Sequence, residues 1–170
     1  MGLTNTNKLI SMDRIDCSGS LKVTLALAAS PDISTNPTDI VLVLDRSGSM
    51  AGSPLANLKS GAKKFIDIIS EATGGSQSGS IGSGSRIGIV SFSDAAVQNS
   101  LLTNSVAKLK AAVDSLSAGG STNHADAFAK ASALFDSSSA NARVMVMFTD
   151  GKTTAGPDPN PVAAAARASG

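Results

Sequence analysis

The clearest pattern in the chain is an uninterrupted apolar run from Ile40 to Leu44, flanked by Asp39 and Asp45. Because the run does not alternate with polar residues, it predicts a strand covered on both faces, which is typical of a central strand in a parallel sheet. Residues 87–92 and 144–148 form two further apolar runs. The pattern therefore predicts several buried strands spread along the chain.

Amphipathic helices are predicted between these strands, because apolar residues recur there at steps of three and four. The first should begin at Ser53, whose hydroxyl would cap a helix with Pro54 in its first turn. Further helices are expected over 106–116, 124–135 and 162–168, and a short edge strand over 95–102. Alternating strands and helices predict an α/β fold, a Rossmann-like open and mostly parallel sheet with helices on both faces.

Residues 1–37 are predicted to be an N-terminal extension, and residues 38–170 the α/β domain. Within the extension, apolar residues alternate over 21–29, which predicts one half-buried strand. Pro31 and Pro37 mark the connection to the domain. The single Cys17 has no disulfide partner in this chain, so it is either a buried thiol or pairs with a cysteine on residues not present here.

Composition and the length of the apolar runs argue against two kinds of function, nucleic-acid binding and membrane spanning. Lys plus Arg number 14 and Asp plus Glu 13, without a basic patch, and the chain has five Phe but no Trp or Tyr. Nucleic-acid binding is not expected, because it needs a basic groove and stacking aromatics. No membrane span is expected either, since no apolar run reaches the required length.

Oxygen-bearing side chains gather at the predicted ends of strands. Asp45 ends the first apolar run, with Ser47 and Ser49 at alternate positions after it, and Asp150 follows the run 144–148. The carboxyl ends of parallel strands share one edge of the sheet, where open α/β sheets bind ligands. Thr122, in a Gly-rich loop, is within reach of that edge. Hydroxyl and carboxylate oxygens in this combination favour a small hard cation.

These residues also carry a family resemblance. Residues 45–49 match Asp-x-Ser-x-Ser, 119–122 match Gly-Gly-x-Thr and 149–151 match Thr-Asp-Gly. Together with the strand over 86–92, they resemble a von Willebrand factor A domain with an intact metal-ion-dependent adhesion site, over residues 38–170. The resemblance implies Mg²⁺, with Mn²⁺ or Ca²⁺ as alternatives, and a protein partner whose Asp or Glu carboxylate completes the coordination. The implied metal ligands are Asp45, Ser47, Ser49, Thr122 and Asp150, and the residues at the ligand rim are Arg46, Asn123 and His124.

Two expectations follow from how this chain differs from the family. The family normally continues past the last predicted helix with further strands, so the domain is expected to lack its last strands. A missing C-terminal segment or a second chain would then complete the sheet.

His124 is the single histidine of the chain, so it has no second histidine with which to bind zinc or to transfer protons. No Gly-x-Ser-x-Gly nucleophile elbow supports a catalytic triad of Ser47, His124 and Asp126.

The resulting functional hypothesis is a metal-dependent protein-binding and adhesion module at the extracellular surface of a bacterium. The alternative is an intracellular assembly subunit of a chelatase-like or chaperone-like ATPase complex, in which a similar metal site grips a partner. An enzyme is not expected, because no pair of acid and base carboxylates and no activated nucleophile are evident.

Overall fold

The structure is a computed structural model that describes residues 36–76 and 79–168. The strand predicted over 21–29 and Cys17 lie outside these residues. Among the described residues, no helix is long and apolar enough to cross a membrane. The elements are β1 (Thr38–Asp45), a short 3-10 turn (Gly48–Met50), α1 (Ser53–Ala72), β2 (Arg86–Phe92), β3 (Ala96–Thr103), α2 (Val106–Asp114), α3 (His124–Ser132), β4 (Ala142–Phe148) and α4 (Pro159–Ala168).

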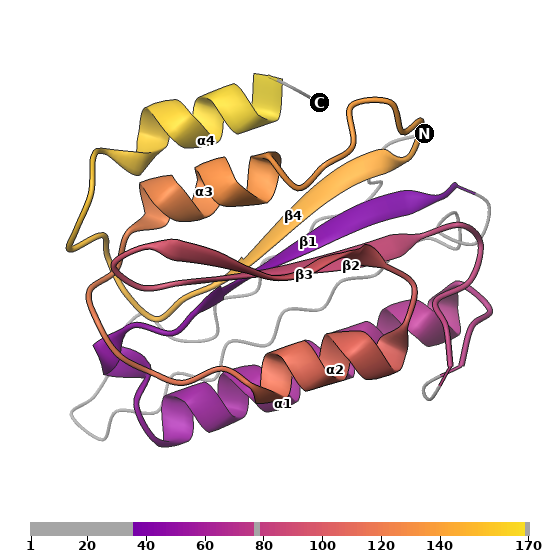
Figure 1. Cartoon of the computed structure of the whole chain (residues 1–170), viewed down its shortest axis with the longest axis horizontal. Helices are drawn as coiled ribbons and strands as arrows, with labels where there is room; N and C mark the ends of the chain where they lie inside the picture. Colours follow the sequence, from indigo (N-terminus) through magenta and orange to yellow (C-terminus); the bar gives the residue numbers. More distant parts are fainter. Residues whose placement is uncertain (1–35, 77–78, 169–170) are drawn as a thin grey trace, which may run out of the picture.

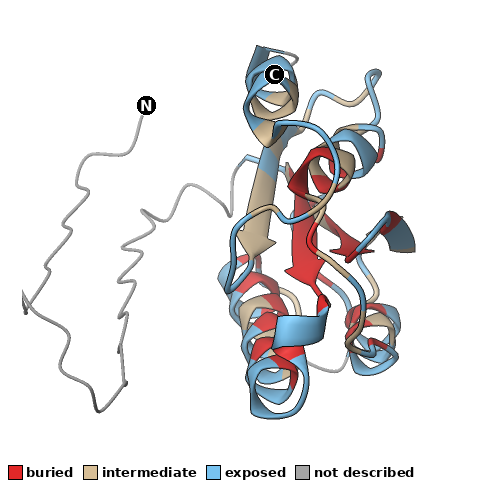
Figure 2. Ribbon diagram, turned by 90° about the vertical axis from the view of Figure 1, so that its left-hand side faces the viewer, coloured by how far each residue is buried: buried red, intermediate tan, exposed pale blue. Residues whose placement is uncertain are grey.

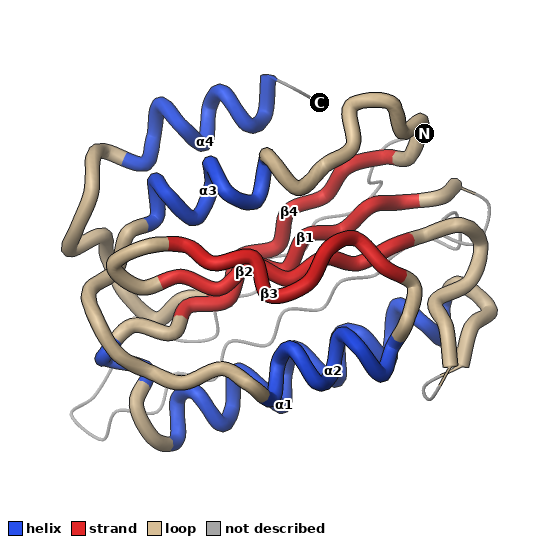
Figure 3. Tube along the Cα trace, viewed as in Figure 1, coloured by secondary structure: helices blue, strands red, loops and turns tan. Residues whose placement is uncertain are grey.

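The strands form an open, four-stranded sheet in the order β3-β2-β1-β4. β1 is central and pairs in parallel with both β2 and β4, whereas β3 returns antiparallel to β2. Helices α1 and α2 cover one face of the sheet, and α3 and α4 lie on the other side (Figures 1 and 3). The predicted fold class, an open and mostly parallel sheet with helices on both faces, is confirmed.

The two faces of β1 supply the centre of two hydrophobic clusters. Ile40, Leu42 and Leu44 belong to the cluster that includes α1 and α2, while Val41 and Val43 belong to the cluster that includes α3. This alternation follows from the two-residue period of a strand. Figure 2 shows β1 as a buried element between the helical layers. The unbroken apolar run is thus explained by a strand covered on both sides.

Two helix starts differ in part from the sequence prediction: α1 begins at the predicted Ser53 but has a different cap, and α4 begins at a different residue. α1 includes Ser53 in its first turn, and its N-cap is Gly52, which has a φ of 79° and no side-chain cap. Gly52 fits there because glycine adopts positive φ without steric cost. α4 begins at Pro159 rather than at residue 162. Its prolines lie in the first turn, where a missing N–H breaks no helical hydrogen bond.

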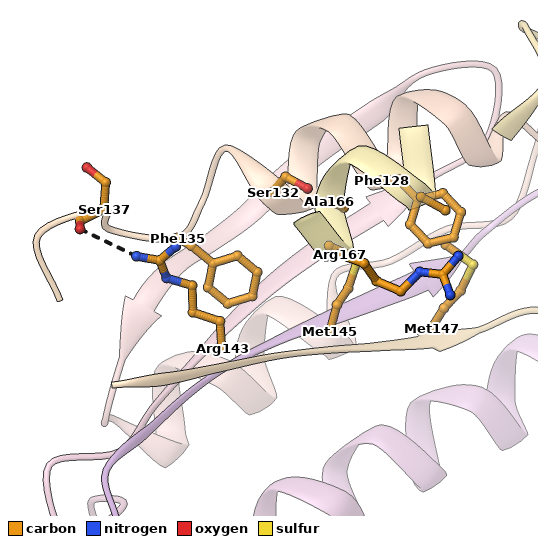
Figure 4. A pocket seen from close by; sticks show the side chains of 10 residues that line it. Phe128, Ser132, Phe135, Ser137, Arg143, Met145, Met147, Ala166 and Arg167 are labelled. Carbon is orange, nitrogen blue, oxygen red and sulfur yellow. Dashed lines mark hydrogen bonds between the residues drawn. The ribbon is translucent and has the colours of Figure 1, made fainter. Parts of the chain in front are cut away.

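β4 lies at one edge of the described sheet and is only partly covered. Its residues are intermediate or exposed, in contrast to the buried β1. A groove of about 660 Å³ runs between β4, α3 and α4 (Figure 4). Its walls combine the apolar side chains of Phe128, Phe135, Met145 and Met147 with two arginines, Arg143 and Arg167.

Candidate metal centre

Four loops meet at the edge of the sheet where β1 ends. The loop after β1 is bonded to the end of β2, through Arg46 N–H to the Phe92 carbonyl oxygen at 2.9 Å. It is also bonded to the 119–123 loop, through Gly48 N–H to the Gly120 carbonyl oxygen at 2.8 Å. Backbone bonds of this kind fix the loops relative to one another without using side chains. The loops that carry the predicted donors are therefore joined to one another through their backbones.

Four of the five predicted donors are linked by direct contacts. Asp45 is fully buried, and its Oδ1 accepts a hydrogen bond from Ser47 N–H at 2.8 Å. The hydroxyls of Ser47 and Ser49 lie 3.2 Å apart. Ser49 Oγ in turn donates to Asp150 Oδ1 at 3.0 Å, across 101 residues of sequence. The structure thus brings Asp45, Ser47, Ser49 and Asp150 together.

Thr122, the fifth predicted donor, is held by its backbone through hydrogen bonds to Thr154 and not to the other four donors. Its N–H donates to Thr154 Oγ1 at 2.9 Å, and its carbonyl oxygen accepts from Thr154 N–H at 2.9 Å. Its side chain is 5% exposed. Within the described residues, the Thr122 hydroxyl makes no hydrogen bond to the other four donors. The structure therefore places the loop of Thr122 against the loop of Ser47 and Ser49, through the bond between Gly48 and Gly120, but does not join its hydroxyl to theirs.

A tightly turned glycine shapes this loop. Gly120 has a φ of 84°, and a Cβ atom there would lie 2.2 Å from Asp94 Oδ2. Asp94 Oδ1 accepts a hydrogen bond from Ser121 N–H at 2.9 Å. Hydrogen bonds from Ser121 lower the pKa of Asp94 below its ordinary value, and the nearby charge of Arg46 acts in the same direction. Asp94 is therefore a carboxylate that anchors the loop bearing Thr122.

The sequence analysis missed Thr149. Its hydroxyl donates to Asp45 Oδ2 at 2.7 Å, so both carboxylate oxygens of Asp45 are engaged. It also contacts His124 Nε2 at 3.2 Å. Thr149 belongs to the Thr-Asp-Gly motif, but nothing in that pattern shows that it orients Asp45. The only signal in the sequence was its position directly after the apolar run 144–148.

The three predicted rim residues occupy different environments. His124 is 8% exposed and is the first residue of α3; its Nδ1 lies 2.7 Å from Thr153 Oγ1, and its ring lies 5.2 Å from Phe92. Asn123 caps α3, accepting a hydrogen bond from Asp126 N–H at 3.1 Å. Arg46 is partly exposed and lines a small cavity beside the site. His124 thus links the start of α3 to the loop after β4, through Thr149 and Thr153, whereas Arg46 is accessible to solvent.

The donor chemistry fits a hard divalent cation. Two carboxylates and neighbouring hydroxyls are oxygen ligands of the kind that Mg²⁺ and Mn²⁺ accept. No group of three or more His, Cys, Asp or Glu side chains suited to a metal ion occurs in residues 36–76 and 79–168. A site of the all-carboxylate or histidine-rich type is therefore not present in the described part of the chain, so a metal ion at this edge would need hydroxyl ligands as well.

An open α/β sheet with such a donor cluster at its carboxyl edge defines a class of ligand-binding domain. The model of the von Willebrand factor type A domain family matches residues 39–170, and the chain belongs to this family. No curated protein sequence shows significant similarity to this chain.

Solved structures of similar fold come from several kinds of protein. The von Willebrand factor domain of the type V pilus tip protein Mfa5 from Porphyromonas gingivalis is 22% identical with a TM-score of 0.62, over 69% of this chain and 39% of that one. An aerotolerance-related membrane protein from Bacteroides fragilis is 21% identical with a TM-score of 0.65, over 78% and 63%. Proximal thread matrix protein 1 from the mussel byssus, with zinc in its adhesion-site motif, is 23% identical with a TM-score of 0.63, over 78% and 33%. The chain thus spans less than two thirds of each of these structures.

Proposed function

We propose that the chain is a divalent-metal-dependent protein-binding module that receives a carboxylate of its partner at the edge of the sheet. The contact series from Asp45 through Ser47 and Ser49 to Asp150 carries this proposal. A bound divalent cation would supply Lewis acidity toward the incoming carboxylate. The residues proposed to hold it are Asp45, Ser47, Ser49, Thr122 and Asp150.

The protein's own contribution is to orient oxygens and to keep the site only weakly negative. Thr149 and Ser47 N–H fix the buried Asp45 carboxylate from both sides. The remaining donors are neutral hydroxyls, so two negative charges face a cation of charge +2. An acidic side chain is therefore not repelled, and Mg²⁺ commonly keeps coordination positions for such ligands. The proposal includes no catalytic step.

The proposed location is the extracellular surface of a bacterium. This rests on the neighbours of similar fold, which include a pilus tip protein and a thread matrix protein of the mussel byssus with zinc in its adhesion-site motif. We prefer this location to the alternative, an intracellular assembly subunit of an ATPase complex, because no observation on the described residues supports the alternative.

The metal site is tested by calorimetric titration of Mg²⁺, Mn²⁺, Ca²⁺ and Zn²⁺ into the wild type and Asp45→Ala. The wild type is expected to bind one metal ion per chain. In Asp45→Ala the affinity for that ion should fall at least about a hundredfold, because a principal anionic ligand is lost. Asp114→Ala, which removes an exposed carboxylate on the end of α2, is the matched control. Equal affinities in the wild type and Asp45→Ala would remove the proposal.

Carboxylate capture is tested separately with acetate. Protein-bound Mn²⁺ should speed the relaxation of the acetate methyl protons beyond the effect of free Mn²⁺, because acetate would occupy the place of the partner's acid. Acetamide, which lacks the charge, should show a much smaller effect. Metal binding without any acetate effect would leave a metal site but contradict its role in gripping a carboxylate.

A further inference from the structure

The groove between β4, α3 and α4 exists because α4 does not close onto the sheet. α4 packs against α3, and none of its residues is buried. On the same face of the sheet, Val41 and Val43 of β1 are fully buried in the cluster with α3, whereas Met145 and Met147 of β4 are only partly buried. A space of about 660 Å³ therefore lies between α4 and β4 (Figure 4).

The walls of this groove are apolar on three sides. Its volume is within the roughly 300–1,000 Å³ that is typical of pockets for small ligands. Methionine side chains adapt to ligands of different shape, and the alanines of α4 leave room above them. The groove therefore suits an apolar ligand of small-molecule size. Its apolar walls are Met145 and Met147 of β4, Phe128 on α3 and Phe135 after it, and Ala163 and Ala166 of α4.

The strand at the floor gives the groove its length. Arg143, Met145 and Met147 lie on the same face of β4, because successive side chains of a strand alternate between its faces. The floor from Arg143 to Met147 is therefore about 13 Å long, at about 3.3 Å per residue. α4 already occupies the helical layer above it, so a further helix has no place there. The space suits a long and thin ligand, such as an acyl chain.

The charged side chains that line the groove are both cationic. Arg143 donates to the Asp136 carbonyl oxygen at 3.3 Å, so its guanidinium is bonded to the protein. Arg167 is exposed near the end of α4, and Figure 4 shows its guanidinium beside Phe128 and Met147. Within the described residues, no Asp or Glu lines the groove. A guanidinium at one end of an apolar groove favours an anionic head group, and it matches a carboxylate in bidentate geometry.

We propose that this groove binds a free fatty acid of medium chain length. The carboxylate would accept hydrogen bonds from the Arg167 guanidinium, and the acyl chain would lie over Met147 and Met145 toward Phe135. Each end of such a ligand then meets the part of the groove that matches its chemistry. The site does not depend on the metal centre, because the groove lies on a face of the sheet and the proposed metal donors lie at its edge.

The test is an NMR titration of the 170-residue chain, labelled at its methionine methyl groups and kept in EDTA. The probe is decanoate below its micelle concentration, and it is expected to shift the methyl signals of Met145 and Met147 in a saturable way. Met50 is buried in the cluster on the other face of the sheet, so its signal should not move and serves as the internal control.

Two further probes separate the contributions of head group and chain. Decyltrimethylammonium has a similar chain with the opposite charge and should bind at least about tenfold more weakly, because it cannot accept from Arg167. Butyrate has the same carboxylate on a short chain and should bind at least about a hundredfold more weakly, because it buries far fewer methylene groups.

Two pairs of variants secure the result. Arg167→Gln should weaken decanoate binding about tenfold, because a hydrogen bond between charged groups is lost. Lys130→Gln removes a positive charge from an exposed position on α3 and should leave binding unchanged. Ala163→Leu fills the groove and should abolish binding, whereas Ala164→Leu makes the same change on the exposed side of α4 and should not. An unmoved Met50 signal shows that each variant is folded.

The outcomes also separate this site from the proposed function. Equal binding of decanoate and decyltrimethylammonium, full binding by Ala163→Leu, or unmoved Met145 and Met147 signals would each overturn the fatty-acid site. Co-sedimentation with phosphatidylglycerol vesicles in the absence of saturable decanoate binding would overturn it too, in favour of a membrane surface. Because the titration runs without metal, a failure of the metal proposal in calorimetry leaves its result intact.

Discussion

At the scale of single residues, Thr149 shows how a neighbour of the proposed ligands sets their geometry. It donates to Asp45 Oδ2 and contacts His124, so it ties the central carboxylate to the start of α3. Side chains that orient a ligand in this way typically account for about 10–100-fold in metal affinity. The hydroxyl of Thr149 is therefore expected to matter although it is not proposed to touch the ion.

We predict that Thr149→Val lowers Mg²⁺ affinity about tenfold while the fold is retained, because the variant keeps the shape but releases one oxygen of Asp45. Calorimetric titration measures the change. Thr38→Val makes the same substitution at the opposite end of the sheet, where the hydroxyl donates to the Asn36 carbonyl oxygen, and should leave affinity unchanged. Identical titration curves for the two variants would rule out the orienting role.

Asp39, at the other end of β1, makes the free energy of unfolding depend on pH. Burial raises the pKa of Asp39, but hydrogen bonds from Arg86, Asn141 and Ser139 outweigh it and hold the pKa below its ordinary value of 3.8. The guanidinium contacts both oxygens, at 2.8 and 2.6 Å. A lowered folded-state pKa means that this stabilisation is complete above pH 3.8 and is lost as the pH falls through the folded-state value.

Asp39→Asn is therefore expected to lower the free energy of unfolding at pH 7 by about 2 kcal/mol, because hydrogen bonds to a charged group are lost. As the pH falls below 3.8 the difference from the wild type should shrink, because the carboxyl of the unfolded wild-type chain then binds a proton before that of the folded chain does. Urea melts at steps from pH 7 to pH 3 measure both quantities. A constant difference across this range would show that Asp39 does not titrate as described.

At the scale of elements, Gly88 decides how closely β2 and α3 pack. It lies inside β2, and a Cβ atom there would meet Leu134 Cδ2 at 2.5 Å. Leu134 is part of the cluster between the sheet and α3. The Ile87 and Ile89 side chains on either side of Gly88 face the opposite cluster. The missing side chain thus leaves room for the residue that follows α3.

Gly88→Ala is predicted to lower the free energy of unfolding by about 1–3 kcal/mol through overpacking. Gly61→Ala gives a control of opposite sign. Gly61 lies in α1 with no heavy atom within 4 Å of its would-be Cβ, so the better helix propensity of Ala should raise stability by about 0.5–1 kcal/mol. Denaturant melts of both variants check the pair, and equal effects of the two would refute the packing argument.

The elements themselves were largely predictable from the sequence, because their causes are local. The run Ile40 to Leu44 is apolar on both faces, and the structure confirms a central strand there. Asp45, Ser47, Ser49 and Asp150 all come directly after apolar runs, so their position at one edge of the sheet could be predicted. The contact between Ser49 and Asp150 agrees with that prediction.

Features that depend on contacts across the fold were not predictable. The role of Thr149 requires knowing that β4 lies beside β1. The bulge at Asn99 depends on pairing with β2, and no residue pattern announces it. Gly52 replaces Ser53 as the cap of α1 because the turn before the helix needs a positive φ. In each case the partner is distant in sequence or the constraint lies in the backbone.

At the scale of the whole molecule, the two edges of the described sheet differ. β3 has two register shifts against β2 and carries polar residues, both of which discourage further strand pairing. β4 pairs with β1 over seven consecutive residues without a shift, and it carries Val144, which is 42% exposed. Its regular, apolar edge beside the groove of Figure 4 is the one suited to accept another strand.

The 170-residue chain is therefore predicted to self-associate through β4, and Val144→Lys should shift it toward the monomer, because a charge on an edge strand opposes pairing. Light scattering coupled to size-exclusion chromatography at several protein concentrations measures the shift. Leu101→Lys introduces the same charge on β3, at a side chain that is 66% exposed, and should leave association unchanged because that edge is already irregular. A wild-type chain that stays monomeric at high concentration would show that β4 is protected in solution, and an equal response to both lysines would indicate that net charge controls the association.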